Sequence, residues 1–124
     1  MKNNETHKSN LLTIDVQEKP STIEIMFSGK STEREPGHFI TPILLESLQY
    51  SSKFNKRVVM NFESLEYMNS STITPLIRIL ENAKDKTCSI SINYKKSKKW
   101  QELCFSALKI FETKDRRIQI KGME

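Results

Sequence analysis

The stretch Arg57–Ala83, RVVMNFESLEYMNSSTITPLIRILENA, combines a short apolar run, a polar motif and an amphipathic repeat. Residues 58–60 are continuously apolar, which is typical of a strand in the middle of a sheet. The apolar positions after the motif recur at the spacing of one helical face: Ile73, Leu76, Ile77 and Leu80. Pro75 is tolerated only in the first turn of a helix, which places the helix start between Ser71 and Thr74. The stretch therefore predicts a strand, a polar turn and a helix.

The flanking segments show the same two periodicities. Apolar and polar residues alternate over four further segments, which predicts four more strands: 12–16, 23–27, 88–94 and 118–120. Helical spacing recurs over 40–48 and 100–111, so the order of elements is ββαβαβαβ. Strands joined through helices run parallel, whereas the opening hairpin is antiparallel. We expect an α/β fold of the STAS-like order, with a mixed sheet of about five strands and helices mostly on one face.

The length and composition indicate one soluble domain. A chain of 124 residues can bury a hydrophobic core but is too short for a pair of ordinary domains. Residues 1–10 are polar and lack periodicity, so we expect a flexible N-terminal tail there, followed by the domain at 11–124. No apolar run is long enough to span a membrane and residues 1–10 do not resemble a secretory signal, so we expect a cytoplasmic protein without a membrane partner.

The cysteines and histidines do not indicate a cofactor. Cys88 and Cys104 both lie in apolar-periodic segments, where reduced cysteines behave as small hydrophobic side chains, so we expect no disulfide. His7 and His38 are far apart in polar surroundings, and neither they nor the cysteines have the spacing of metal ligands. We therefore expect no metal and no other cofactor.

The motif Asn69, Ser70, Ser71, Thr72 stands between the predicted central strand and the helix that follows. Together with that strand and its acidic turn, the motif resembles the signature of STAS domains, the family of anti-sigma factor antagonists, in which Asp-Ser-Ser-Gly opens a helix. The end piece WQELCFSALKIF resembles the third helix of a subgroup of STAS-like bacterial regulators. The resemblance implies a signalling module that is not an enzyme and that works by binding a protein partner.

Phosphorylation of a serine in this motif is the switch that the resemblance implies. The commoner form of the motif places the acceptor at Ser71, whereas a branch whose phosphorylated threonine follows an asparagine places it at Ser70, and both remain candidates. The chain departs from the family pattern at two positions, since Asn69 replaces an aspartate and Thr72 replaces a glycine. Asparagine keeps the capping ability of aspartate without its charge, and threonine has less backbone freedom than glycine.

A helix start is a suitable place for a phosphate. The first backbone N–H groups of a helix lack partners, and the positive end of the helix dipole favours an anion. A phosphate adds about −1.5 to −2 charges at neutral pH, which changes the surface that a partner must contact. Serine, threonine and asparagine are also the preferred N-caps of any helix, so capping is the alternative interpretation, and it is compatible with phosphorylation.

The expected contact surface surrounds the motif. It consists of the motif, the residues before it and the start of the first helix: Asn69, Ser70, Ser71, Thr72, Tyr67, Met68 and Phe39. Met68 fits a position beneath the helix start equally well. The expected partners are a histidine-kinase-like ATPase acting as serine kinase or anti-sigma factor, a phosphatase that resets the switch, or a diguanylate cyclase that the module activates.

Two other groups of residues are weaker candidates. The residues Lys95–Trp100 combine lysines with an aromatic side chain, as single-stranded nucleic-acid sites do, so nucleic-acid binding is the alternative function. Trp100 has the helical spacing of Leu103, Cys104 and Phe111, however, which favours core packing for Trp100 and a solvated loop for the lysines. The carboxylates that we considered for acid–base catalysis have no histidine or nucleophile at a recognisable spacing: Glu35, Glu63 and Glu66.

Overall fold

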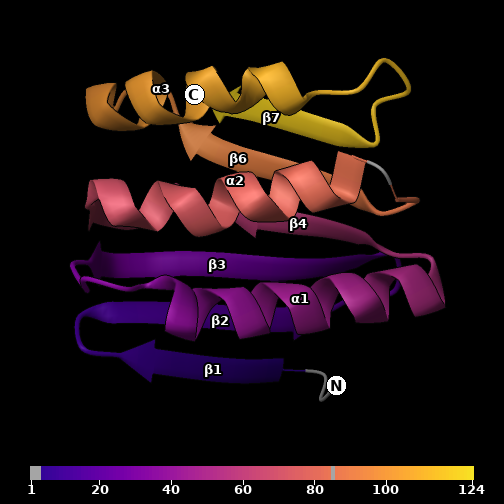
Figure 1. Cartoon of the computed structure of the whole chain (residues 1–124), viewed down its shortest axis with the longest axis horizontal. Coiled ribbons are helices and arrows are strands. Elements are labelled where there is room, and N and C mark those ends of the chain that lie inside the picture. Colours follow the sequence, from indigo (N-terminus) through magenta and orange to yellow (C-terminus); the bar gives the residue numbers. More distant parts are fainter. Residues whose placement is uncertain (1–3, 85) are drawn as a thin grey trace.

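The chain folds around one mixed sheet (Figure 1). The structure is a computed structural model that describes residues 4–84 and 86–124. Within these residues the sheet has seven strands: β1 Asn4–Ser9, β2 Leu12–Glu18, β3 Thr22–Ser31, β4 Arg57–Asn61, β5 Leu65–Met68, β6 Ser89–Lys95 and β7 Ile118–Met123. Strands β1, β2 and β3 are antiparallel neighbours, and β3, β4, β6 and β7 continue the sheet in parallel. The predicted mixed sheet is therefore confirmed, with two strands more than expected.

The helices lie on one face of the sheet, as predicted (Figure 1). They are α1 Gly37–Phe54, α2 Ser70–Lys84 and α3 Lys99–Ser106, which continues as the 3-10 helix η1 Ala107–Phe111. Helix α2 begins one residue before the predicted start, and Pro75 is buried near its N-terminal end. Within the described part of the chain, no helix combines the length and the apolar character needed to cross a membrane.

Strand β1 shows that the prediction of a flexible tail was wrong for residues 4–9. These residues pair antiparallel with β2 over their whole length. Their side chains, NETHKS, are polar and none is fully buried, so hydrophobic periodicity does not reveal this strand. The pairing rests on the backbone ladder and on cross-strand contacts such as the hydrogen bond from Thr6 Oγ1 to Asp15 Oδ1 at 2.6 Å. Residues 1–3 of the predicted tail lie outside the described residues.

Strand β5 is the other strand that the sequence did not predict, and it delivers the chain to the start of α2. After β4, Phe62 is buried, and pairing with β3 resumes where Leu65 lies opposite Gly29. Gly29 has φ +81°, and a Cβ atom there would lie 2.0 Å from the carbonyl oxygen of Leu11, so this position requires glycine. Strand β5 has two exposed residues between buried ends, which does not produce the alternation typical of a strand.

Four aromatic side chains form the core beneath this part of the sheet. Phe62 stacks on Phe27 with ring centroids 4.3 Å apart and contacts Phe105 of α3 at 4.7 Å, while Tyr94 lies 5.8 Å from Phe105. All four are buried. Trp100 is partly buried and packs against this core, which confirms the prediction for that residue.

Helix α3 buries a different face from the one that we predicted. Its buried residues are Gln101 and Phe105, with Leu108 of η1, whereas Leu103 and Cys104 are exposed. The amide of Gln101 explains the choice, because Nε2 donates to the backbone oxygens of Phe62 and Leu65 at 2.6 and 3.1 Å. The chain leaves regular sheet pairing between β4 and β5, so the buried carbonyl oxygens of Phe62 and Leu65 need hydrogen-bond donors from elsewhere in the protein. Cys88 is buried, whereas Cys104 is exposed although it lies in an apolar-periodic segment, and both are free thiols.

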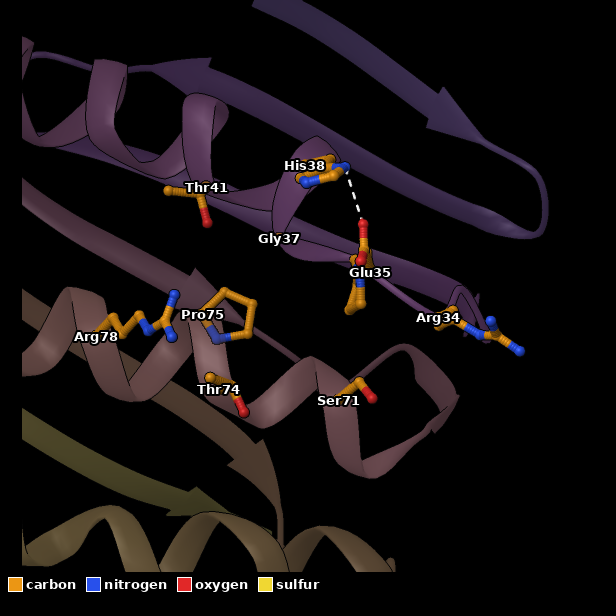
Figure 2. A pocket seen from close by; sticks show the side chains of 10 residues that line it. Arg34, Glu35, Gly37, His38, Thr41, Ser71, Thr74, Pro75 and Arg78 are labelled. Atoms are coloured by element: carbon orange, nitrogen blue, oxygen red, sulfur yellow. Dashed lines mark ion pairs between the residues drawn. The ribbon is translucent and has the colours of Figure 1, made fainter.

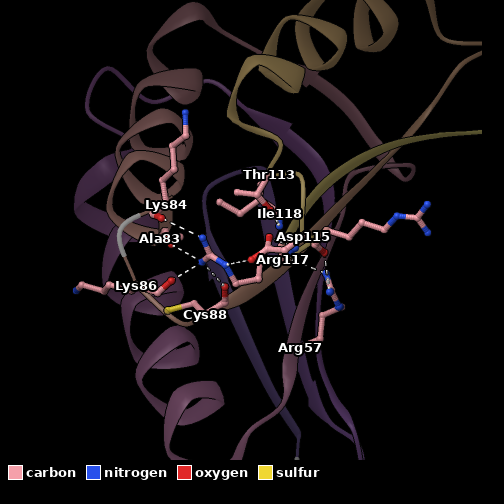
Figure 3. Close-up of polar contacts among 10 residues, drawn as sticks. Arg57, Ala83, Lys84, Lys86, Cys88, Thr113, Asp115, Arg117 and Ile118 are labelled. Atoms are coloured by element: carbon pink, nitrogen blue, oxygen red, sulfur yellow. Dashed lines mark hydrogen bonds and ion pairs between the residues drawn. The ribbon is translucent and has the colours of Figure 1, made fainter.

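The C-terminal end of α2 is held by Arg117, at the start of the segment that becomes β7 (Figure 3). Its guanidinium donates to backbone oxygens at the helix end and the turn after it: Ala83 at 3.3 Å, Lys84 at 3.1 Å, Cys88 at 3.4 Å, and Lys86. Asp115 Oδ2 accepts a hydrogen bond from Arg117 Nε at 2.9 Å. The last carbonyls of a helix have no partner within it and attract a cation, so this arginine satisfies both needs. We call this arrangement the Arg117 clasp.

Candidate functional site

Asn69 caps the N-terminal end of α2. Its Oδ1 accepts hydrogen bonds from the backbone N–H of Thr72 at 3.1 Å and from Thr72 Oγ1 at 2.8 Å. Its Nδ2 donates to the backbone oxygen of Glu33 at 2.8 Å, and its own N–H donates to the backbone oxygen of Ser31 at 3.0 Å. The asparagine thus supplies a donor that an aspartate at this position would lack. It ties the helix start to the loop between β3 and α1.

Thr72 has a structural role in this cap. Its side chain is buried, with 1% of its surface exposed, and its Oγ1 lies 2.7 Å from Ser31 Oγ. The hydroxyl therefore has two partners inside the protein, Ser31 and Asn69. A buried polar group with its hydrogen bonds satisfied stabilises the fold and offers no surface to a partner. Thr72, which was predicted in the contact surface, is therefore too buried to touch a partner directly.

Ser70 and Ser71 are the first two residues of α2, and both are exposed. Within residues 4–84 and 86–124, neither side-chain hydroxyl has a hydrogen-bond partner. Asn69 already provides the cap, so the fold does not use these two hydroxyls as caps. They stand free at the end of the helix where the dipole and the unpaired N–H groups favour an anion.

A cavity of about 390 Å³ lies between this helix start and the loop before α1 (Figure 2). Ser71 lines it from α2, and two arginines line it from different elements, Arg34 from the loop and Arg78 from α2. Within the described residues, neither arginine has an ion-pair partner. Neither arginine was predicted as a site residue from the sequence. Arg78 stands seven residues after Ser71, on the same side of the helix, whereas nothing in the sequence indicates that Arg34 comes close.

The remaining predicted contact residues differ in exposure. Tyr67 is 49% exposed, whereas Met68 is only 9% exposed and belongs to the core, so of its two predicted positions the one beneath the helix start is correct. Phe39 is partly buried and lines a neighbouring cavity that shares Arg34, Glu35 and His38 with the first one. The start of α1 therefore lies beside the motif, as expected.

The cap, the two free serines and the cavity lie within the part of the chain that matches a known protein family. Residues 6–114 match the model described as SiaC family regulatory phosphoprotein. The chain belongs to the SiaC family. A search for similar curated proteins gives no match. The family description agrees with a signalling role for this chain, and the relation to STAS domains remains a resemblance in the motif and in the order of elements.

The lysine cluster of this SiaC-family chain is partly used inside the fold. Lys98 Nζ donates to the backbone oxygens of Glu63 at 2.7 Å and Leu65 at 3.2 Å, so the prediction of a solvated side chain is wrong for Lys98. Lys96 Nζ lies 3.7 Å from Glu124 Oε1. Lys99 is exposed. The carbonyls between β4 and β5 explain the position of Lys98, because they face the start of α3.

The carboxylates do not assemble a catalytic group in the described part of the chain. Glu35 pairs with His38 at 3.4 Å, and both side chains are more than half exposed. Glu66 is exposed and Glu63 contacts Lys98 through its backbone oxygen. Residues 4–84 and 86–124 contain no group of three or more histidine, cysteine or acidic side chains placed to hold a metal ion.

Proposed function

We propose that this chain is a partner-switching regulator controlled by phosphorylation of Ser70 or Ser71. The observation that carries the proposal is the pair of exposed, unpartnered hydroxyls at a helix start whose cap is a different residue, Asn69. Membership of a family of regulatory phosphoproteins supports it. A phosphate on either serine replaces a neutral surface hydroxyl and leaves the cap intact.

The charges around the cavity support a phosphate at this place. A phosphate on Ser71 would lie at the N–H groups of the helix start and beside the cavity that Arg34 and Arg78 also line, and neither arginine has an ion pair in the described residues. Ser70 does not line the cavity, so a phosphate on Ser70 projects from the surface toward a partner. In either position the added charge and its hydration oppose a partner that packs tightly there. A cost of about 3 kcal/mol lowers affinity by roughly a hundredfold.

The partners follow from the same switch. The unmodified form binds a histidine-kinase-like ATPase, which acts as serine kinase or anti-sigma factor, and the phosphorylated form releases it. A phosphatase then removes the phosphate. In a close variant the unmodified form activates a diguanylate cyclase. All of these take place in the cytoplasm, where ATP is available, and none requires catalysis by this chain.

Phosphoryl transfer to the full chain tests the proposal. The chain is incubated with ATP and an ATPase-type serine kinase encoded beside it, and peptides are analysed by mass spectrometry. We expect one phosphate, on Ser70 or Ser71, and its loss in either Ser70→Ala or Ser71→Ala. Ser64→Ala is the matched control, because Ser64 is exposed in the turn before β5. If the kinase is shown to be active by its autophosphorylation and neither serine carries a phosphate, the proposed phosphorylation switch is contradicted.

A further inference from the structure

Helix α3 and η1 expose a row of apolar side chains. Leu103 is 76% exposed and Ile110 is 75% exposed, the two highest values among the large exposed hydrophobic residues of the described chain. Ala107 is exposed between them and Cys104 at their side. The positions 103, 107 and 110 have the spacing of one helical face. We call these four residues the α3 face.

The fold does not account for the α3 face. The opposite side of the same helix already packs into the core through Phe105 and Leu108, so α3 and η1 are held in place without the exposed residues. Single exposed hydrophobic residues are ordinary, whereas a contiguous exposed apolar patch is typical of an interaction surface. The anchoring of Phe105 in the aromatic core also means that this surface is present before a partner arrives.

The surroundings of the α3 face are basic. Residues 95–114 contain six lysines and two glutamates, a net charge of +4, while the whole chain has +5. Glu102 is half-buried, whereas Glu112 is exposed and has one carboxylate oxygen bound to the fold. Glu102 Oε2 is buried, and burial together with this carboxylate raises the pKa of Tyr94. Glu112 Oε2 accepts a hydrogen bond from the backbone N–H of Ile120 at 3.0 Å. Lys99 and Lys109 are exposed on α3 and η1, so the rim of the face carries positive charge.

We propose that the α3 face is a docking surface for an acidic amphipathic helix of a protein partner. Apolar residues of that helix would cover Leu103, Ala107 and Ile110, and its glutamates or aspartates would face Lys99 and Lys109. The charge argues against a second copy of this chain, because two such rims repel each other. A nucleic acid would meet aliphatic side chains at the centre of the surface, where no base can stack. The surface lies on other elements than the proposed phosphoacceptors, so the inference does not rest on phosphorylation.

The single tryptophan of the chain, Trp100, lies on α3 and reports on binding. The probe is a synthetic helical peptide with leucines on one face and glutamates beside them. We expect a saturable change in Trp100 fluorescence, amide shifts centred on residues 99–111 in NMR spectra of the labelled full chain, and weaker binding at high salt. Leu103→Ser and Ile110→Ser should each weaken binding about tenfold or more, while Leu45→Ser, at an exposed leucine of α1, should leave it unchanged.

Several results would overturn the inference. One is the absence of a saturable change in Trp100 fluorescence at millimolar peptide. Another is that Leu103→Ser and Ile110→Ser bind the peptide as tightly as the wild type. A third is that a peptide with lysines in place of the glutamates binds as tightly as the acidic peptide. Self-association that disappears in Leu103→Ser would assign the face to a second copy. Tighter binding of phosphatidylserine vesicles or of single-stranded DNA than of the peptide, lost in the same variants, would assign it to a membrane or a nucleic acid.

Discussion

The two ends of α2 are built in opposite ways. At the C-terminal end, the Arg117 clasp satisfies the backbone oxygens that the helix leaves open and is itself paired with Asp115 (Figure 3). At the N-terminal end, one residue, Asn69, makes the cap, and the hydroxyls of the next two residues have no partner in the described residues. The comparison separates an end that holds the fold from an end whose exposed side chains are available for modification.

The arginines near the two ends of α2 differ in the same way. Arg57 donates to backbone oxygens at the N-terminal ends of β6 and β7, and Arg117 donates to those at the C-terminal end of α2. Arg34 and Arg78, at the other end, have no ion-pair partner in the described residues. An arginine with its donors satisfied contributes to stability, whereas an exposed unpaired arginine contributes little and is free for an added anion.

Removal of the clasp should have the largest effect on stability. Arg117→Ala leaves backbone oxygens of Ala83, Lys84 and Cys88 without their donor, and we expect a loss of about 2–4 kcal/mol in the free energy of unfolding. Urea denaturation followed by circular dichroism measures it. The matched control is Arg78→Ala, an arginine on the same helix, for which we expect a change of less than about 0.5 kcal/mol. Equal losses for the two arginines would remove the contrast between the ends.

Loss of the cap should have the next largest effect. Asn69→Ala removes the acceptor of the Thr72 N–H and the donor to the backbone oxygen of Glu33, and we expect a loss of about 1–2 kcal/mol. Asn69→Asp keeps the acceptor and adds a negative charge at the helix start, so its loss should be smaller. The same denaturation experiment compares the two variants. An equal loss for the two variants would mean that the tie to the loop before α1, which both remove, is the dominant contribution and not the cap.

The clasp should also make stability depend on pH in acid. A hydrogen bond from Thr113 and N–H groups of Arg117 lower the pKa of Asp115 from 3.8 to about 2. Because the folded-state pKa is the lower one, the carboxylate stabilises the fold above about pH 4, and this contribution is lost as the pH falls from 3.8 toward 2. The difference in stability between the wild type and Asp115→Asn should be full at pH 5 and mostly lost at pH 2. A difference that is constant over this range would contradict the lowered pKa.

The free hydroxyls should have the smallest effect on stability. Ser70→Ala and Ser71→Ala remove side chains without partners in the described residues, so we expect changes within about 0.5 kcal/mol in thermal or urea unfolding. Thr72→Val is the informative neighbour, because it removes a buried hydroxyl that has two partners. A loss for either serine as large as the loss for Thr72→Val would show that the serine supports the fold.

The sequence predicted the elements whose burial is periodic and missed those held by hydrogen bonds. The four strands with alternating apolar residues, the central strand and the three helices are where periodicity placed them. Strand β1 is polar throughout, and β5 depends on Gly29 and on the interior donors Lys98 and Gln101, which no local pattern reveals. The prediction of the buried side of α3 was wrong because apolar residues lie on both sides of this helix, so their spacing does not show which side faces the core.

The candidate site divides in the same way. Local sequence sufficed to place Ser70 and Ser71 at the start of a helix, since Pro75 and the apolar spacing fix that start. The burial of Thr72 depends on Ser31, which is 41 residues away in the chain. The cavity arginine Arg34 comes from the loop before α1, and only the pairing of β3 with β5 brings that loop to α2.

The central claim is that the start of α2 accepts a phosphate without a change in the fold. The most direct test compares the phosphorylated and unmodified full chain by NMR and by urea denaturation. We predict a change in unfolding free energy of less than about 1 kcal/mol, with amide shifts confined to the start of α2 and the neighbourhood of Arg34 and Arg78. A loss of several kcal/mol, or shifts that extend to the Arg117 clasp, would contradict the account.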